Sequence, residues 1–205
     1  CVDSVVLASR SGRVQQGSED DLADLLLQYP TAVTCIVGDA SCLGSARLVL
    51  TQSSEHRHSM GSSLLRGIVH AAGVLADGVL VNQSAEQLRR SHAPKAVGAS
   101  LLHSASSDGP LKYYIAFASI VGLLGNAGQG SYAAANAWLD AMVGNCRRRR
   151  GLTGTSIQWG YVAQVGLTAR NALEGHAERL GMGLVARQMA ESVLHAACNG
   201  DRVSR

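Results

Sequence analysis

Short apolar runs alternate along the chain with longer segments of helical periodicity. Runs of aliphatic and β-branched residues that end at a turn former predict strands, and leucines or alanines at helical spacing predict helices. A proline inside one helical segment predicts a break or a bend there. The predicted strands are 4–9, 32–37, 65–70, 113–119 and 155–158, and the predicted helices are 20–28, 42–51, 84–103 (interrupted at Pro94), 130–149 and 187–198.

Strands that alternate with helices are typical of an α/β protein, with a parallel sheet covered by helices on both faces. In such sheets the ligand lies beyond the carboxyl ends of the strands. We therefore expect the functional site on one edge of the sheet, among the residues that follow the predicted strands. Those residues are Arg10, Asp39, Ala71, Ala72, Gly73, Ser119, Trp159 and Gly160.

The composition supports one well-buried domain over residues 1–205, because 46% of the residues are hydrophobic and only 16% are charged. The longest uncharged apolar stretch, 113–125, is shorter than the roughly 18 residues of a membrane span. A net charge of +3 and one arginine run, 147–150, do not indicate nucleic-acid binding. That run is interpreted as a solvated helix end that complements the helix dipole.

The five cysteines are scattered and the seven histidines show no ligand spacing, so we expect neither a disulfide framework nor a metal site. A reduced, cytoplasmic protein is predicted. The chain begins Cys1-Val2-Asp3 without a signal peptide, which suggests a piece of something longer.

A dinucleotide-binding sheet normally begins with a strand, a glycine-rich turn and a helix that holds the pyrophosphate. The only match to that glycine spacing, 181–186, does not follow a predicted strand. We therefore expect that the first strand, turn and helix are missing, and that the isolated chain binds a dinucleotide weakly.

The densest chemical signal lies at the head of the 130–149 helix. Tyr132 and Asn136 are four residues apart and share one helical face. Ser119 ends the preceding strand, and Lys95 lies in the helix before that strand. Taken singly, these residues fit a packing tyrosine, a turn-forming serine and a surface lysine, and a catalytic role for the set is implied by the resemblance that follows.

The sequence resembles the ketoreductase domain of a modular polyketide synthase, in the short-chain dehydrogenase/reductase superfamily, over nearly its whole length. Most of the superfamily has lysine four residues after the tyrosine, whereas these ketoreductases have asparagine there and take the lysine from the earlier helix. The resemblance implies a Rossmann-like, doubly wound parallel sheet. It is carried by His-Ala-Ala-Gly-Val-Leu at 70–75, Ala-Pro-Lys-Ala-Val-Gly at 93–98, Phe-Ala-Ser-Ile-Val-Gly at 117–122, Gly-Gln-Gly-Ser-Tyr-Ala-Ala-Ala-Asn at 128–136 and Gln-Trp-Gly at 158–160.

Reduction of a ketone by hydride places negative charge on the carbonyl oxygen, which then needs a proton. We assign Tyr132 as proton donor, Ser119 as carbonyl polariser, Lys95 as electrostatic partner and Asn136 as organiser of a proton-relay water. A tyrosine has a pKa of about 10, and a nearby ammonium is expected to lower it. The serine hydroxyl would stabilise the developing oxyanion.

The resemblance also implies NADPH as cofactor. Arg10 stands where these proteins grip the 2′-phosphate, and a guanidinium suits phosphate because it can bind two oxygens. Asp39 resembles the aspartate that contacts adenine, although an acid that caps the next helix explains it equally well. The segment expected beside the adenosine ribose is Ala71, Ala72 and Gly73; the preceding His70 is expected to be structural.

Residues 75–77, Leu-Ala-Asp, resemble the Leu-Asp-Asp fingerprint of the subtype that gives D-configured β-hydroxyl products. Asp77 matches the diagnostic acid and Ala76 departs from the fingerprint. Leu124 stands where the opposite subtype has tryptophan. We expect stereocontrol by Asp77, with a loop acid as the alternative. The glycine-rich segment 161–185 corresponds to the family's substrate lid.

These residues predict NADPH-dependent reduction of a β-ketoacyl thioester carried by an acyl carrier protein, with other synthase domains in the same longer chain. The alternatives are a fatty-acid synthase reductase, a free-standing reductase of a small carbonyl compound, and a non-catalytic structural module. The arginine run 147–150 is an alternative docking patch for an acidic carrier protein. No nucleic acid, membrane span or metal is expected.

Overall fold

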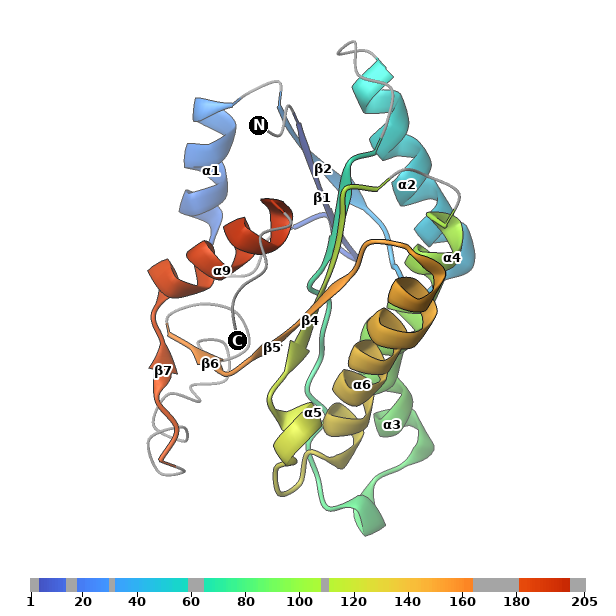
Figure 1. The fold of residues 1–205 in the computed structure, drawn as a ribbon, viewed down its shortest axis with the longest axis vertical. Coiled ribbons are helices and arrows are strands. Elements are labelled where there is room, and N and C mark those ends of the chain that lie inside the picture. Colours follow the sequence, from blue (N-terminus) through green and yellow to red (C-terminus); the bar gives the residue numbers. More distant parts are fainter. Residues whose placement is uncertain are drawn as a thin grey trace. The chain divides into compact units, whose positions relative to one another are not determined.

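The computed structural model describes residues 4–13, 18–29, 32–58, 65–107, 111–163 and 181–199. The chain divides into two compact units: unit 1 comprises residues 1–65 and 97–110, and unit 2 comprises residues 66–96 and 111–205. Both are built from parallel strands and helices (Figure 1).

Unit 1 contains two parallel strands, β1 (Val5–Ser9) and β2 (Val33–Val37), whose pairing ends with Ser9 opposite Val37. Helix α1 (Glu19–Gln28) connects them, and Figure 1 shows α1 and α2 (Leu43–His58) on opposite sides of the pair. Helix α4 (Gly98–Ala105) packs against α2. Because the strands run in parallel, Arg10 and Asp39 follow them at the same end.

Unit 2 contains a parallel sheet in the order β3 (Gly67–His70), β4 (Tyr113–Ser119) and β5 (Thr155–Trp159). The central strand β4 is mostly buried, as expected for a parallel strand covered on both faces. Helix α6 (Gly130–Ala141) packs on β4 and on α3 (Ala85–His92), and α9 (Arg187–Asn199) packs on β4 from the other side (Figure 1).

The parallel strands and the intervening helices confirm the predicted α/β class, with strand boundaries within two residues of the prediction. The described ladders form three sheets, namely the two-stranded pair of unit 1, the three-stranded sheet of unit 2 and a further short pair in unit 2, where the pattern predicts five strands in one sheet. Helix α2 continues to His58, beyond the predicted end at residue 51. Gln, Glu and Arg have high helix propensity, so a polar stretch can extend a helix.

Segment 161–185, expected to be a glycine-rich substrate lid with no predicted strand, has a short parallel strand at each end: β6 (Tyr161–Val162) and β7 (Leu184–Val185). Two-residue strands carry too little periodicity to be recognised in a sequence. Most of the expected lid, 164–180, lies outside the described residues.

The chain is not interrupted at Pro94 but changes its type of helix there. Helix α3 ends at His92, and Ala93–Val97 form a wider π-helical turn, η2, before α4 begins.

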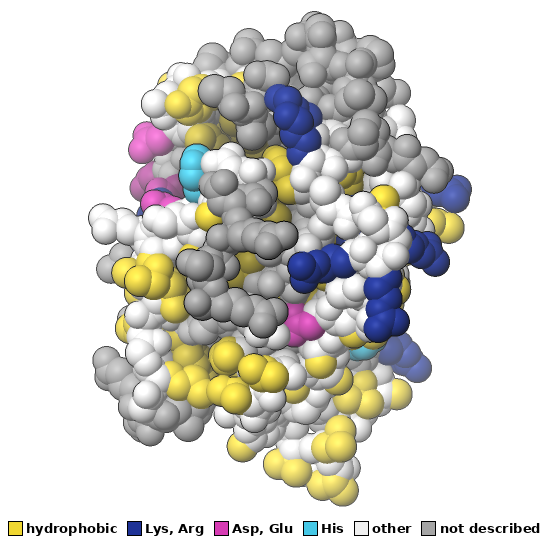
Figure 2. Space-filling view, in the orientation of Figure 1, with side chains coloured by type: hydrophobic (Ala, Val, Ile, Leu, Met, Phe, Trp, Pro, Cys, Tyr) yellow, Lys and Arg dark blue, Asp and Glu magenta, His cyan; other side chains and the backbone are white. Residues whose placement is uncertain are grey.

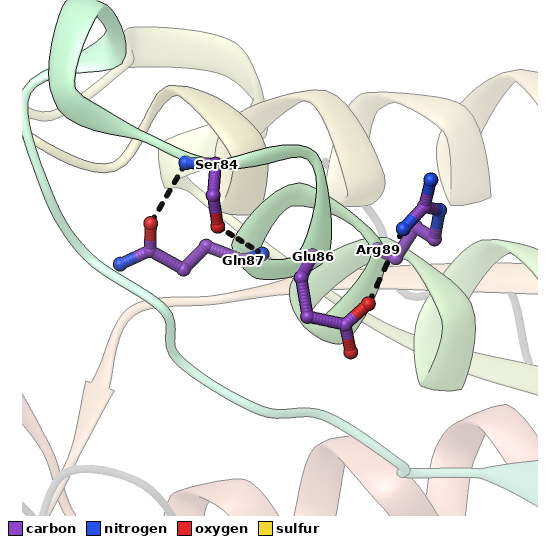
Figure 3. A network of polar contacts seen from close by, with 4 residues as sticks. All are labelled: Ser84, Glu86, Gln87 and Arg89. Atoms are coloured by element: carbon purple, nitrogen blue, oxygen red, sulfur yellow. Dashed lines mark hydrogen bonds and ion pairs between the residues drawn. The ribbon is translucent and has the colours of Figure 1, made fainter.

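The start of α3 is fixed by a capping box in which the side chains of Ser84 and Gln87 each accept from the other residue's backbone N–H. An exposed Glu86–Arg89 ion pair follows in the same helix (Figure 3). None of the described helices is long and apolar enough to cross a membrane.

Arg147 corrects the interpretation of the arginine run as a solvated helix end. After α6 the chain forms a π-helical turn, η3 (Met142–Arg147), and a 3₁₀ turn, η4 (Arg148–Arg150). Only 1% of Arg147 is exposed; its guanidinium lies 4.1 Å from the centre of the Tyr114 ring, and its Nε donates to the Thr153 carbonyl. Arg148–Arg150 are exposed, so one arginine of the four is a core residue.

Arg147→Ala is expected to lower the free energy of unfolding by about 3 kcal/mol, because it removes a buried cation–π contact and leaves the Thr153 carbonyl without this donor. Chemical denaturation measures the difference. The matched control is the exposed Arg149→Ala, expected to change stability by less than about 0.5 kcal/mol. Equal effects of the two substitutions would contradict the structural role of Arg147.

Candidate active site

Unit 2 brings together the four residues assigned to catalysis. Tyr132 lies in the first turn of α6 and Asn136 one turn further, Ser119 ends β4, and Lys95 lies in η2. All four are buried. Nζ of Lys95 is 5.4 Å from the centre of the Tyr132 ring, and Nδ2 of Asn136 donates to the Tyr132 carbonyl at 2.7 Å.

The ammonium of Lys95 is held by the backbone of β4. Its Nζ donates to the carbonyl oxygen of Phe117 at 2.7 Å, two residues before Ser119. Burial lowers the pKa of Lys95 from 10.5 to about 8, and the carboxylate of Asp140 acts in the opposite direction. Lys95 therefore remains mostly protonated at neutral pH and loses its proton as the pH rises through about 8.

The expected lowering of the tyrosine pKa is wrong. Burial raises the pKa of Tyr132 above its ordinary value of 10.0, because the phenolate loses solvation. Hydrogen bonding to the side chains of Asn136 and Ser119 acts in the opposite direction and only partly offsets burial. The Lys95 ammonium donates to the Phe117 carbonyl, and Tyr132 stays a protonated phenol at neutral pH.

The Ser119 hydroxyl is fixed at the carboxyl end of the sheet. It donates to the Trp159 carbonyl on the paired strand β5 and accepts from the backbone N–H of Val121, each at 3.3 Å. Val121 begins the short helix α5 (Val121–Leu124), which packs against α6. A Cβ on Gly122 would lie 3.0 Å from the Ala137 nitrogen and from Cβ of Asn136, so glycine permits this close approach.

Asn136 retains an unused acceptor. The residue is fully buried, its Nδ2 is engaged, and its Oδ1 has no hydrogen-bond partner among the described residues. A buried amide oxygen without a partner is costly unless a water or ligand donates to it. This atom fits the predicted organiser of a water molecule.

Asp77 and Gly78 are hydrogen-bonded to the segment that leads into α6. Nε2 of the buried Gln129 donates to Oδ2 of Asp77 at 2.8 Å, and the Gly78 N–H donates to the Gly128 carbonyl at 2.8 Å. Asp77 is close enough to raise the pKa of Tyr132 and that of Tyr161. Sequence reasoning missed Gln129, although its place three residues before Tyr132 was a usable signal.

Apolar side chains are exposed on both segments that adjoin this link. Leu80 and Val81 follow Asp77, Leu123 and Leu124 precede Gln129, and each is at least 65% exposed. Figure 2 shows exposed apolar side chains in yellow on the face that it draws. An apolar surface beside a polar site suits a ligand that has both characters.

Asp140 is a second residue that the sequence analysis missed. Its Oδ1 accepts from the Ser156 hydroxyl and its Oδ2 accepts from Nε2 of Gln158, so both carboxylate oxygens tie α6 to β5. It lies two i,i+4 steps beyond Tyr132 on the same helix. That spacing was the available signal, but an acid there also fits an exposed helix face.

The residues expected to bind a cofactor are divided between the units. In unit 1, Arg10 is exposed in a turn where Ser11 and Arg13 are also exposed, a donor set that fits a phosphate group. Oδ1 of Asp39 accepts from both the backbone N–H and the hydroxyl of Ser41, and these bonds lower the Asp39 pKa. These bonds close a turn before α2 begins, whereas the alternative from the sequence was a cap on that helix.

In unit 2, the chain after β3 is exposed at Ala71 and Ala72, and Gly73 is half-buried. Small side chains at this point let a ligand approach the backbone closely. Among the described residues, no group of three or more His, Cys, Asp or Glu side chains is arranged to hold a metal ion.

The comparisons with known proteins agree on one kind of domain. The family model described as "KR domain" matches residues 1–164. The mycocerosic acid synthase-like polyketide synthase of Mycobacterium tuberculosis is 39% identical over 162 residues, which cover 79% of this chain and 7% of that protein. Polyketide synthase GfsA of Streptomyces halstedii is 38% identical over 195 residues, covering 94% of this chain and 2% of that protein.

Solved structures give the same result. A structure titled "Structure of A1-type ketoreductase" matches with a TM-score of 0.84 and 28% identity, over 97% of this chain and 40% of that chain. The first ketoreductase of the tylosin PKS matches with a TM-score of 0.77 and 30% identity, over 98% of this chain and 41% of that chain. The chain thus spans less than a tenth of these curated relatives and under half of these solved chains.

Asp140→Asn is expected to lower the pKa of Lys95 below about 8, because no carboxylate then opposes the effect of burial. Peptide mass spectrometry after brief treatment with an amine-acylating reagent, repeated across pH, reports the neutral fraction of Lys95. The control Ser156→Ala removes one hydrogen bond to Asp140 and keeps its charge. A profile that shifts equally in both variants would contradict an electrostatic role of Asp140.

Proposed function

The chain belongs to the KR domain family, the ketoreductase domains of polyketide synthases, and from this premise we propose that it reduces a β-ketoacyl thioester to a β-hydroxyacyl thioester with NADPH. The observation that carries the proposal is the convergence of Lys95, Ser119, Tyr132 and Asn136, from three elements of unit 2, in one buried cluster.

The reaction adds one hydride and one proton across the ketone. NADPH, when bound, supplies the hydride to the carbonyl carbon. The Ser119 hydroxyl, at the carboxyl end of β4, would turn its one hydrogen from the Trp159 carbonyl to the substrate carbonyl oxygen and stabilise the growing negative charge there. The Tyr132 phenol gives that oxygen its proton. A raised tyrosine pKa suits this direction of reaction, because the donor must carry its proton before hydride arrives.

After the transfer, Tyr132 is a buried phenolate beside the Lys95 ammonium. Opposite charges in a low-dielectric site attract strongly, so Lys95 stabilises the phenolate that the reaction leaves. A water that donates to Oδ1 of Asn136 connects this pair to the solvent and returns the proton. Lys95 therefore stabilises the phenolate that is left after proton transfer, whereas burial keeps Tyr132 a neutral phenol before it.

The exposed set Arg10, Ser11 and Arg13 supports NADPH over NADH, because guanidinium and hydroxyl donors match the 2′-phosphate that distinguishes the two. Ala71, Ala72 and Gly73 are proposed to lie along the adenosine ribose. Asp39 is proposed to orient the turn next to the adenine, since one of its oxygens already accepts two hydrogen bonds.

The substrate is proposed to arrive on the phosphopantetheine arm of an acyl carrier protein. The exposed apolar residues on both sides of the Asp77–Gln129 link, Leu80 and Val81 with Leu123 and Leu124, would line the approach of an acyl chain. We also propose a cytoplasmic location and further synthase domains in the same longer polypeptide; the large size of the relatives supports the further domains.

We also propose that the product is D-configured and that Asp77 directs the stereochemistry. Gln129, three residues before the proton donor Tyr132, donates to Asp77 and holds this acid beside the start of α6. From there the acid can exclude one orientation of the entering thioester. Leu124, where the opposite subtype has tryptophan, supports the same product.

Tyr132→Phe is expected to lower the rate of ketone reduction by about 10²- to 10⁴-fold with the fold intact, because only the proton donor is lost. NADPH oxidation, followed with a β-ketoacyl carrier-protein substrate in the full natural polypeptide, measures the effect. The control Tyr113→Phe changes a tyrosine at the start of β4 and should leave the rate unchanged. Retained turnover in Tyr132→Phe would refute the assigned role.

Chiral chromatography of the released β-hydroxy product is expected to show mainly the D isomer. Asp77→Ala is expected to reduce the isomeric excess more than it reduces the rate, because the acid orients the substrate and donates no proton. Mainly L product from the unmodified protein would contradict this stereochemical assignment.

A further inference from the structure

The catalytic lysine lies in an irregular part of the backbone. Residues Ala93–Val97 form the π-helical turn η2, and Lys95 is at its centre. Pro94 has no N–H, so the preceding turn cannot complete its hydrogen bonds in the ordinary α pattern. π-Turns are rare and often occur at functional sites. The orientation of the Lys95 side chain therefore depends on contacts that hold η2 from outside the helix.

His70 provides that support from the sheet. It is the last residue of β3, only 3% exposed, and its Nε2 lies 3.2 Å from the carbonyl oxygen of Lys95. A carbonyl oxygen can only accept, so the imidazole donates, and this fixes the tautomer with the proton on Nε2. Burial lowers the His70 pKa to about 4, with the Lys95 ammonium acting in the same direction. The imidazole is therefore neutral at neutral pH.

The two ends of Lys95 are held by two neighbouring strands. The carbonyl accepts from His70 on β3, and the ammonium donates to the Phe117 carbonyl on β4. These strands are paired, with His70 opposite Ala116, the residue before Phe117. The position of the lysine relative to Tyr132 thus depends on both strands.

We propose that His70 is a positioning residue for the reaction: its neutral imidazole donates to the Lys95 carbonyl and fixes the η2 turn so that the ammonium lies beside the Tyr132 ring. This inference rests on the proposed function, because it assigns His70 a role only through Lys95. Its competitor is a histidine that merely fills the core at the end of β3.

The two roles differ in what they predict for the charge of Lys95. The described groups that act on this ammonium are Tyr132 and Asp140 from α6, the Phe117 carbonyl from β4 and His70 from β3. If the turn is released, the ammonium moves toward water and its pKa rises from about 8 toward its ordinary value of 10.5. Loss of core packing alone would not change that pKa.

The experiment measures kcat and KM against pH in the full natural polypeptide for His70→Phe and His70→Gln. Phenylalanine fills the space and donates nothing, whereas glutamine places an amide N–H where Nε2 was. Unmodified protein is expected to lose activity as the pH rises through about 8. His70→Phe is expected to lower kcat by about tenfold to a hundredfold with little change in KM, and to move this alkaline limb upward. His70→Gln is expected to restore both.

Two controls separate the possible outcomes. Ile68→Ala, in the same strand, removes buried packing without touching Lys95, so it should lower the melting temperature and leave the alkaline limb in place. An unmoved limb in His70→Phe, or an equal shift in Ile68→Ala, would overturn the proposal. If His70→Phe does not fold, His70→Asn replaces it, because its amide nitrogen occupies the Nδ1 position and cannot reach the carbonyl.

Lys95→Ala distinguishes failure of this inference from failure of the proposed function. Retained reduction in Lys95→Ala would refute the catalytic role of the lysine itself. Loss of reduction in Lys95→Ala, together with an unchanged pH profile in His70→Phe, would refute the role of His70 alone.

Discussion

The site depends on one buried ammonium that is kept charged. A lysine removed from water normally loses its proton or requires a partner, because the interior solvates charge poorly. Lys95 is 3% exposed, and its direct hydrogen bond is to a neutral group, the Phe117 carbonyl. The carboxylate of Asp140 adds an attraction, yet burial still dominates and leaves the pKa near 8. The Lys95 pKa thus lies only slightly above neutral pH, so small changes in its surroundings alter the charged fraction.

Burial acts in opposite directions on the two members of the pair. It makes the lysine easier to deprotonate and the tyrosine harder to deprotonate, so the resting site contains a neutral phenol beside a cation. That state is the one from which a ketone can be protonated. For the reverse reaction, oxidation of an alcohol, the phenol would have to ionise first, against the same burial. The environment of the pair therefore favours reduction.

The pattern of apolar runs predicted the five main strands, because uncharged, mostly apolar runs such as 113–119 coincide with strands, in that case the buried central strand. The resemblance to ketoreductase domains, carried by the spacing of Tyr132 and Asn136 with Ser119 and Lys95 upstream, predicted the residues that meet in unit 2. The π-helical geometry of η2 was beyond that reasoning, since a proline indicates a break and not the kind of turn that replaces it. The contacts of Gln129, His70 and Asp140 were missed because each joins segments far apart in sequence. The burial of Arg147 was missed because the sequence does not distinguish it from the three arginines that follow, whereas in the fold its guanidinium packs on the Tyr114 ring.

The two-oxygen attachment of Asp140 to Ser156 and Gln158 has a mechanical consequence for α6. The carboxylate lies about 12 Å along the helix from Tyr132, at 1.5 Å per residue, and it resists both rotation of the helix about its axis and sliding along β5. A rigid helix transmits such a constraint over its whole length. The direction of the Tyr132 phenol is therefore set partly at the far end of the helix, by Ser156 and Gln158 on β5.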